Sequence, residues 1–417
     1  MVTASVAVQA ARTAAGPQSR GWLAVATATF AIAWGGNEFT PLLVMYRTRG
    51  DFTPLAVDLL LFAYVLGIVP ALLIGGPLSD RFGRRRLMLP APVLAALGST
   101  ILAAGADSEV TLAVGRVFSG LALGLAMAVG GSWIKELSSP PSDDRDAGAR
   151  RAAMSLTAGF GLGAATAGVL AQWAPAPTVL SYAVNVAMAL VAAVLLTGAP
   201  ETRAPRRNGI PAGGHSNFRR WNAISAPTRR FWLIVVPVAP WVFGAAASAY
   251  AVLPALMTHR AAAAPIAFSA LLCVVTLGVG FAVQHLGRRL GGDGRRGVLM
   301  ALVLVVLGMG LAAWAASVLT IWAALVAAAV LGAGYGMALL AGLEEIQRLA
   351  GPDDLAGLTA IFYSVSYLGF AVPAALAFLS QRWAGLTYPV MFAVGALAAT
   401  GCLLVVLAGA KRLSAIS

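Results

Sequence analysis

Residues 76–86 read Gly76-Pro77-Leu78-Ser79-Asp80-Arg81-Phe82-Gly83-Arg84-Arg85-Arg86, a short charged turn between two long apolar runs. Its spacing is G-x3-D-R-x-G-R-R. An altered copy runs from Gly280 to Arg289, where both glycines and the arginine pair are kept while Gln284 and His285 replace the aspartate and the first arginine. Two matched turns about 200 residues apart predict a duplicated membrane bundle built from two similar halves.

The amino-acid composition is that of a protein embedded in lipid. Hydrophobic residues make up 59% of the 417 residues and charged residues 11%, whereas about a quarter of the residues of a soluble domain are charged. The mean hydropathy is +0.82. The net charge of +13 does not indicate nucleic-acid binding, because the arginines lie in short loops between apolar runs and form no basic domain. The composition predicts a polytopic membrane protein.

Twelve apolar runs are long enough to cross a bilayer, since about 20 helical residues span the hydrocarbon core. An even number of spans places both chain ends on the same side. We predict an all-α membrane protein with twelve transmembrane helices in two pseudo-symmetric six-helix bundles. The runs are 22–46, 55–78, 87–105, 111–136, 153–173, 179–198, 231–257, 265–286, 297–315, 318–343, 357–380 and 388–410.

The distribution of lysine and arginine predicts the orientation in the membrane. With the N-terminus inside, cytoplasmic segments hold 24 of the 29 basic residues and the outer loops hold 4, while Arg116 lies within a span. Basic residues gather in the loops on the cytoplasmic side. We therefore expect a multi-pass protein of the plasma (inner) membrane with both termini in the cytoplasm.

The longest polar interruption, rich in proline and arginine, separates six spans from six. We expect a cytoplasmic tail at 1–21, an N-terminal bundle at 22–198, a cytoplasmic linker at 199–229 and a C-terminal bundle at 230–417. The tail has no apolar core long enough for a cleaved signal, so the first span is expected to act as the insertion signal.

The charged turn resembles the loop between helices 2 and 3 of the major facilitator superfamily, a large family of secondary transporters. An ordinary cytoplasmic loop is also rich in arginine, but it requires no glycines or aspartate at fixed spacing. The resemblance implies a charge relay that locks helix 2 against helix 11, with Asp80 facing the positive end of a helix. Gly76 should permit close packing and Gly83 a tight turn. The predicted gating residues are Gly76, Asp80, Arg81, Gly83, Arg84 and Arg85.

Three further segments resemble motifs of the same superfamily. In span 4, Arg116, Gly120 and Gly124 are four apart and share one helix face, as in a family motif whose arginine is assigned to proton transfer. Pro200-Glu201-Thr202 resembles the end of span 6 in drug-efflux members. Span 5 carries glycines like those of the antiporter motif, but Gly163-Ala164 stands where that motif has glycine and proline, so its kink is missing. Together these segments imply a drug:proton antiporter-like member.

Ionisable residues inside an apolar run are costly and therefore indicate function. At about 1.5 Å per residue, Glu38 lies roughly 12 Å and Arg116 roughly 8 Å from the outer ends of their spans, so they could pair in the outer half of the first bundle. Protonating such an acid frees the arginine, and desolvation helps the acid hold its proton. Asp58 is the third candidate for proton coupling, unless it lies in the headgroup layer; Arg116 could instead form a structural ion pair.

Polar and aromatic residues inside the spans are candidates for a substrate path between the bundles. Tyrosines in particular suit a bulky apolar or amphipathic solute. Each could instead be packed between helices or lie at the membrane interface. The substrate-binding candidates are Trp34, Asn37, Tyr64, Asn185, Tyr250, Tyr335, Tyr363 and Tyr367.

Motifs for other energy sources and for catalysis are missing from the sequence. It contains no G-x4-G-K-[ST] phosphate loop, no Cys/His metal spacing and no G-x-S-x-G elbow. Cys273 and Cys402 both fall inside spans and imply no disulfide framework. We therefore expect no cofactor, no metal and no enzyme activity, and transport that draws on an ion gradient.

The sequence favours a proton-coupled exporter of hydrophobic or amphipathic small molecules that works by alternating access. One alternative is proton-coupled uptake or export of a specific metabolite such as a sugar or a siderophore. A second is a membrane enzyme or receptor on a degenerate transporter scaffold. The expected partners are a small-molecule substrate, protons and the lipid bilayer, without nucleic acid, and the chain is expected to act as a monomer.

Overall fold

The computed structural model describes six stretches of the chain, all helical apart from short turns and loops: 21–49, 52–138, 147–203, 229–289, 294–350 and 355–414. Residues 1–20 of the predicted tail (1–21) and residues 204–228 of the predicted linker (199–229) lie outside the described residues.

The described residues of the first half form six helical rods, each made of one helix or of consecutive helical segments. Thr53 and Ser108 begin two of them as N-caps, because their side-chain oxygens accept the N–H groups of Ala56 and Thr111. The rods are α2 (Gly21–Arg49), α3 (Pro54–Phe82), α4 (Arg84–Met88) with α5 (Pro90–Ala104), α6 (Glu109–Leu125) with the π-helix η2 (Ala126–Gly130) and α7 (Gly131–Leu137), α8 (Ala147–Trp173), and α9 (Leu180–Thr197).

The second half repeats this plan with more interruptions. Its rods are η4 (Phe231–Val235) with α11 (Ala239–Ala247), η5 (Ser248–Val252) and α12 (Leu253–Leu256), then α13 (Pro265–Arg289), α14 (Gly294–Val318), α15 (Ile321–Leu349), α16 (Leu355–Tyr367) with η6 (Leu368–Phe370) and α17 (Ala371–Arg382), and α18 (Tyr388–Ser414).

Eleven helices in the described stretches are long and apolar enough to cross a membrane, and they match eleven of the twelve predicted runs. The exception is α2, which has 29 residues but carries the polar Asn37 and Glu38 near its centre. Its residues 31–46 are all buried, and it packs against α8, α9 and α13. A helix screened from lipid by its neighbours can carry more polar residues.

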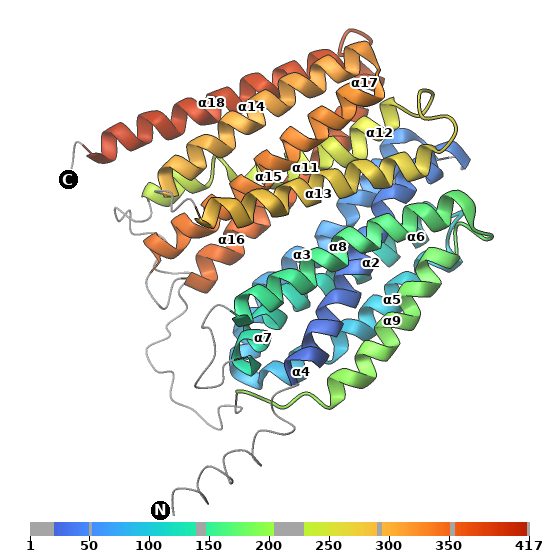
Figure 1. Ribbon diagram of the computed structural model, residues 1–417, viewed down its shortest axis with the longest axis vertical. Coiled ribbons are helices and arrows are strands. Elements are labelled where there is room, and N and C mark those ends of the chain that lie inside the picture. The colour runs from blue at the N-terminus through green and yellow to red at the C-terminus, as the bar shows by residue number, and fades with distance from the viewer. Residues whose placement is uncertain are drawn as a thin grey trace, which may run out of the picture.

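Figure 1 shows the two halves side by side, the first coloured blue to green and the second yellow to red. Across the boundary, α8 lies next to α13, and α3 packs against α16 and α17. The two copies of the charged turn end the second helix of each half, α3 and α13. We call the end of the molecule with the turn 76–86 the inner end, and the end with loops 105–108 and 174–179 the outer end.

Glycines let equivalent helix pairs in the two halves approach closely. A Cβ added to Gly120 of α6 would lie 2.1 Å from the carbonyl oxygen of Tyr64 in α3. In the second half, a Cβ on Gly336 of α15 would lie 2.2 Å from the carbonyl oxygen of Gly280 in α13. Small residues permit such backbone contacts in membranes, so the glycines of spans 4 and 10 are packing positions in both halves.

Two glycines of the charged turn differ in role. Gly83 has φ +100°, so the predicted tight turn is confirmed. The predicted close packing at Gly76 is wrong, because a Cβ there would meet nothing within 4 Å. Its neighbour Gly75 makes that approach instead, with a Cβ 3.1 Å from the side chain of Ala128.

The missing proline of span 5 has the expected structural effect. α8 runs unbroken through Gly163-Ala164. In the second half, the equivalent rod is interrupted by the 3-10 turn η6 shortly before Pro373, whose missing N–H removes one helical hydrogen bond. Of these two equivalent segments, α8 is continuous and the one formed by α16, η6 and α17 is interrupted.

Candidate functional site

A cavity of about 510 Å³ lies between the two halves and extends to the inner end. The first half lines it with α2, η2, α7 and α8, and the second half with α13, α15 and α16. Most of its lining residues are apolar, and a few are polar or charged. The lining residues used below are Lys135, Phe160, Gln284, Tyr335, Glu344, Gln347 and Tyr363.

A smaller pocket of about 30 Å³, room for about one water molecule, adjoins this cavity. Both are lined by Phe160, Leu277 and Tyr335. The smaller pocket is also lined by five further aromatic rings, and its strongest polar groups are Arg116 and Asn37.

Four aromatic rings of the second half line the smaller pocket and contact one another. The ring of Phe243 lies 4.4 Å from that of Tyr367, 5.0 Å from that of Phe370 and 6.0 Å from that of Tyr335, between centres. The hydroxyl of Tyr367 donates to the sulfur of Met127 in the first half at 3.0 Å. We call Phe243, Tyr335, Tyr367 and Phe370 the aromatic layer.

Arg116 of α6 is fully buried and borders the smaller pocket. Its Nη1 donates to the carbonyl oxygen of Gly36 at 3.3 Å, and its Nε to that of Leu60 at 3.4 Å. Its guanidinium carbon lies 4.1 Å from the ring centre of Tyr64 and 4.6 Å from that of Phe39. Carbonyl oxygens and aromatic faces therefore hold this charge.

The predicted ion pair between Glu38 and Arg116 is not formed in the described structure. Glu38 is fully buried, and its Oε1 shares a hydrogen bond with Ser99 Oγ of α5 at 2.9 Å. Its Oε2 has no hydrogen-bond partner. Glu38 and Arg116 share the interior of the first half, but Glu38 points to α5 and Arg116 to the backbone of α2 and α3. Depth along a span does not indicate the direction in which a side chain points around the helix axis.

Asp58 is buried among the described residues. It forms an ion pair with Arg47 of α2, whose Nη1 also donates to the carbonyl oxygen of Ala251 in the second half at 3.3 Å. The Oε1 of Gln172 accepts the N–H of Ile266 at 3.0 Å. Ile266 lies in the first turn of α13, where N–H groups have no partner within their own helix. These two bridges between the halves form what we call the outer seal.

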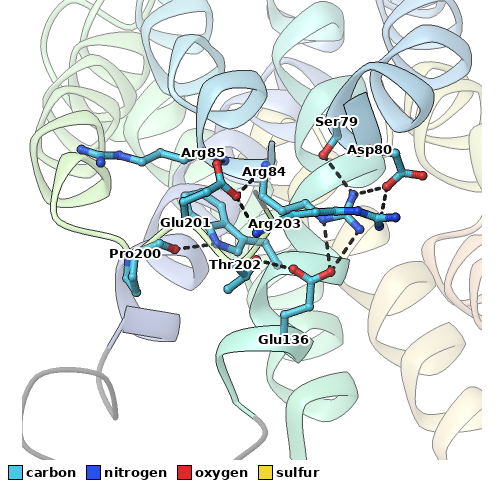
Figure 2. Close-up of polar contacts among 10 residues, drawn as sticks. Ser79, Asp80, Arg84, Arg85, Glu136, Pro200, Glu201, Thr202 and Arg203 are labelled. Atoms are coloured by element: carbon cyan, nitrogen blue, oxygen red, sulfur yellow. Dashed lines mark hydrogen bonds and ion pairs between the residues drawn. The ribbon is translucent and has the colours of Figure 1, made fainter. Parts of the chain in front are cut away.

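At the inner end, Arg84 joins three elements of the first half (Figure 2). Its Nη1 donates to Ser79 Oγ and Asp80 Oδ1, each at 3.0 Å. Its Nη2 and Nε donate to Glu136 Oε1 of α7 at 3.0 and 3.2 Å. The side chain of Arg84 is only 8% exposed, so these bonds are better shielded than those of a surface ion pair.

The relay that the resemblance implied for Asp80 differs from the structure. The partners of Asp80 in the described residues are Arg84 at 3.0 Å and Arg203 at 2.8 Å, both in the first half and neither at the start of helix 11. Arg203 belongs to the segment that follows α9. The exposed Arg81 lies over the ring of Phe82 at 5.1 Å. Here the turn is bonded within its own half.

Glu201 of the P-E-T segment explains why this segment lies against the charged turn (Figure 2). Its two carboxylate oxygens accept the backbone N–H groups of Arg84 and Arg85, each at 2.9 Å. A Cβ on Gly83 would lie 2.5 Å from Glu201 Oε2, so the glycine also makes room for the carboxylate. The start of the linker is thereby fixed to the predicted gate.

Most predicted substrate-binding residues lie at the two cavities. Asn185 and Trp34 line neither of these two cavities. Asn185 is fully buried and donates to the carbonyl oxygen of Ala31 at 2.7 Å, while the backbone of Trp34 lies against Gly163. Those that line a cavity are Asn37, Tyr64, Tyr250, Tyr335, Tyr363 and Tyr367.

Sequence reasoning missed several cavity residues. Gln284 lines the larger cavity, and its place in the second charged turn, where the first has an aspartate, was a usable signal. Glu344 also lines this cavity. No sequence pattern indicated Phe160, Phe243 and Phe370, because phenylalanine in a membrane helix is as common on a lipid-facing side as in a cavity.

Neither cysteine indicates a metal or redox centre. Cys273 and Cys402 are free thiols, and Cys273 Sγ accepts a hydrogen bond from Asn37 Nδ2 across the boundary between the halves at 3.3 Å. Among the residues placed by the structure, no group of three or more His, Cys, Asp or Glu side chains could hold a metal ion.

The sequence matches a family model described as Major Facilitator Superfamily over residues 23–374. It is similar to the bacillibactin exporter of Bacillus subtilis (strain 168), with 25% identity over 155 residues, covering 36% of this chain and 39% of the relative. It is also similar to the arabinose-proton symporter of the same organism, with 32% identity over 90 residues, covering 22% of this chain and 19% of the relative. The chain thus matches less than half the length of either relative.

Solved structures resemble this one over nearly the whole chain. A peptide transporter POT in complex with sulfate has a TM-score of 0.77 at 16% identity, covering 94% of this chain and 95% of that chain. A nucleoside transporter has a TM-score of 0.72 at 10% identity, covering 93% and 99%. At these identities the likeness shows the fold alone.

Proposed function

This chain belongs to the Major Facilitator Superfamily, and we propose that it exports hydrophobic or amphipathic small molecules in exchange for protons. Its family and fold are those of secondary transporters. Such proteins bind their substrate between the two helical halves and expose the site to one side of the membrane at a time.

The arrangement of cavity and seal supports alternating access. The larger cavity extends to the inner end, whereas the two bonds of the outer seal join the halves at the opposite end. With the inner end in the cytoplasm, as the basic residues of the loops predict, this is an inward-facing state. The outward-facing state would break the Arg47–Ala251 and Gln172–Ile266 bridges and close the cavity at the inner end.

The observation that carries the proton-coupling proposal is the burial of Glu38 without a cationic partner. Three acids are buried in the described residues: Glu38, Asp58 and Glu345. Asp58 pairs with Arg47, and Glu345 pairs with Arg230 at 2.7 Å. A buried carboxylate is costly unless it is paired or takes up a proton. Glu38 therefore suits a group that binds and releases a proton during transport.

The walls of the cavity support an amphipathic substrate. Phe160, Tyr335 and Tyr363 offer aromatic surface, which an apolar solute can cover without losing hydrogen bonds to water. Lys135 and Glu344 lie toward the inner end of the same cavity. A molecule with an apolar body and a polar group would match both regions.

A specific metabolite is the second candidate, and the polar side of the cavity favours it. Gln284 and Gln347 supply amides and Glu344 a carboxylate, groups that can orient a hydroxylated solute by hydrogen bonds. The names of the two curated relatives, a bacillibactin exporter and an arabinose-proton symporter, also fit substrates of this kind.

A growth assay tests the proposed export. A susceptible bacterial host expressing this chain should tolerate higher concentrations of lipophilic cationic and neutral toxins than a host with an empty vector. An uncoupler, at a dose that alone does not slow growth, should abolish that resistance because it collapses the proton gradient. Resistance that survives the uncoupler would contradict proton coupling, and unchanged sensitivity across the panel would favour the metabolite candidate.

A further inference from the structure

The hydrogen bonds around Glu38 need one more proton than an ionised carboxylate provides. Ser99 Oγ lies 2.9 Å from Glu38 Oε1 and 2.9 Å from Asn185 Oδ1. Both oxygens are acceptors when Glu38 is ionised, and a hydroxyl has only one proton to donate. With Glu38 ionised, one of the two contacts would bring oxygens together with no proton between them.

Asn185 cannot supply this proton by turning its amide over. Its Nδ2 donates to the carbonyl oxygen of Ala31 at 2.7 Å, and a reversed amide would place Oδ1 against that oxygen. The side chain is also held closely by α2, because a Cβ on Gly35 would lie 2.5 Å from Asn185 Oδ1. The amide therefore keeps its acceptor toward Ser99.

We infer that Glu38 carries the exchanged proton in this inward-facing structure, and that Ser99 and Asn185 are the positioning residues that hold it; the exchange itself rests on the proposed function. Protonated Oε1 donates to Ser99 Oγ, Ser99 donates to Asn185 Oδ1, and Asn185 Nδ2 donates to Ala31. Every donor in this series of hydrogen bonds then has an acceptor. Glu38 Oε2, which has no partner, is a neutral carbonyl oxygen in this arrangement.

The other groups near Glu38 do not supply the missing donor. The cation among them, Arg116, is bonded to carbonyl oxygens, and the hydroxyls of Tyr46 and Tyr182 bond each other at 2.9 Å. Helix α5 contributes Ser99, which does not titrate. The titratable groups within electrostatic reach of Glu38 are Tyr46 on α2, Tyr64 on α3, Arg116 on α6 and Tyr182 on α9.

Loss of the proton reverses the direction of the hydrogen bond between Glu38 and Ser99. Ser99 must then donate to the carboxylate of Glu38, and Asn185 Oδ1 loses its donor. Because Ser99 lies on α5 and Asn185 on α9, proton release alters a contact between two helices of the first half. The proton is thereby linked to the packing of the bundle that must move during transport.

Infrared difference spectroscopy tests this arrangement in the purified full-length chain in lipid nanodiscs, titrated with pH. The protonated-acid carbonyl band that disappears in Glu38→Gln belongs to Glu38. In Asn185→Leu, Ser99 is free to donate to the ionised carboxylate, so the midpoint of this band should move to lower pH by about one unit. In Ser99→Ala the acid loses its acceptor, so the band should change frequency.

Ser181→Ala is the matched control. This buried serine of α9 donates to the carbonyl oxygen of Ala167 at 3.3 Å and takes no part in the hydrogen bonds around Glu38. Its spectrum should equal that of the wild type. A Glu38 band unchanged in both Ser99→Ala and Asn185→Leu would overturn the inference even if resistance depends on protons. A responsive band without proton-dependent resistance would instead reject the proposed exchange and leave the proton-holding role standing.

Discussion

Everted membrane vesicles with the Glu38→Gln variant are expected to lose pH-driven accumulation of a neutral lipophilic dye. In vesicles acidified inside, exchange of one proton per dye molecule supports about a tenfold concentration ratio for each pH unit. Glutamine cannot release a proton, so the ratio in the variant should fall to about one. Fluorescence of the accumulated dye measures this ratio.

The Glu38→Gln variant should still fold, because its amide imitates the protonated acid and can donate to Ser99 Oγ. It should also keep the exchange of dye between equal concentrations, which needs no proton. The control is Glu109→Gln, an exposed acid in the first turn of α6, which should accumulate dye like the wild type. Full accumulation by the Glu38 variant would remove this residue from the coupling.

Gly120→Val is expected to remove most of the folded protein. Its Cβ would lie 2.1 Å from the carbonyl oxygen of Tyr64, and a clash with backbone cannot be relieved by a side-chain rotation. Overpacking costs about 1–3 kcal/mol and occasionally more, and here α3 and α6 would have to separate. Size-exclusion chromatography after detergent extraction should show aggregate, and any folded fraction should have a lower Tm.

The matched control for this packing is Gly278→Val in α13. Gly278 is exposed, and a Cβ there meets nothing within 4 Å, so the variant should elute and unfold like the wild type. A Gly120→Val protein as stable as the Gly278→Val protein would show that α3 and α6 do not need the close approach.

The architecture could be predicted because its signals are local or periodic. The two charged turns mark the same place in each half, and the apolar runs matched eleven membrane-length helices in the described residues. The first run was the difficult one, since α2 is polar at its centre. Its burial by neighbouring helices comes from tertiary packing, which composition does not report.

The candidate site was harder to predict because a membrane helix is apolar on most of its circumference. The sequence places Glu38 and Arg116 in the first half. It does not indicate which neighbouring helix each side chain faces, because successive helix residues point about 100° apart. For the same reason Asn185, buried against Ala31, could not be distinguished from Asn37, which borders the smaller pocket.

The inner gate shows the limit of a motif that is read alone. The charged turn was assigned a relay toward helix 11, whereas Arg84 bonds to Glu136 and Glu201 accepts the backbone N–H groups of the turn. These partners lie about 50 and about 120 residues away in sequence and meet the turn only because the first half closes into a bundle. Spacing within the motif could not indicate them.

Proton movement coupled to substrate movement is the most direct test of the transport mechanism. Purified wild-type chain is reconstituted in lightly buffered liposomes that contain a pH-sensitive dye and the toxin with the strongest resistance in the growth assay. With no initial pH difference, we expect the lumen to acidify as the toxin leaves, and we expect no acidification with Glu38→Gln. Toxin efflux by the wild type without any change in lumen pH would contradict proton exchange.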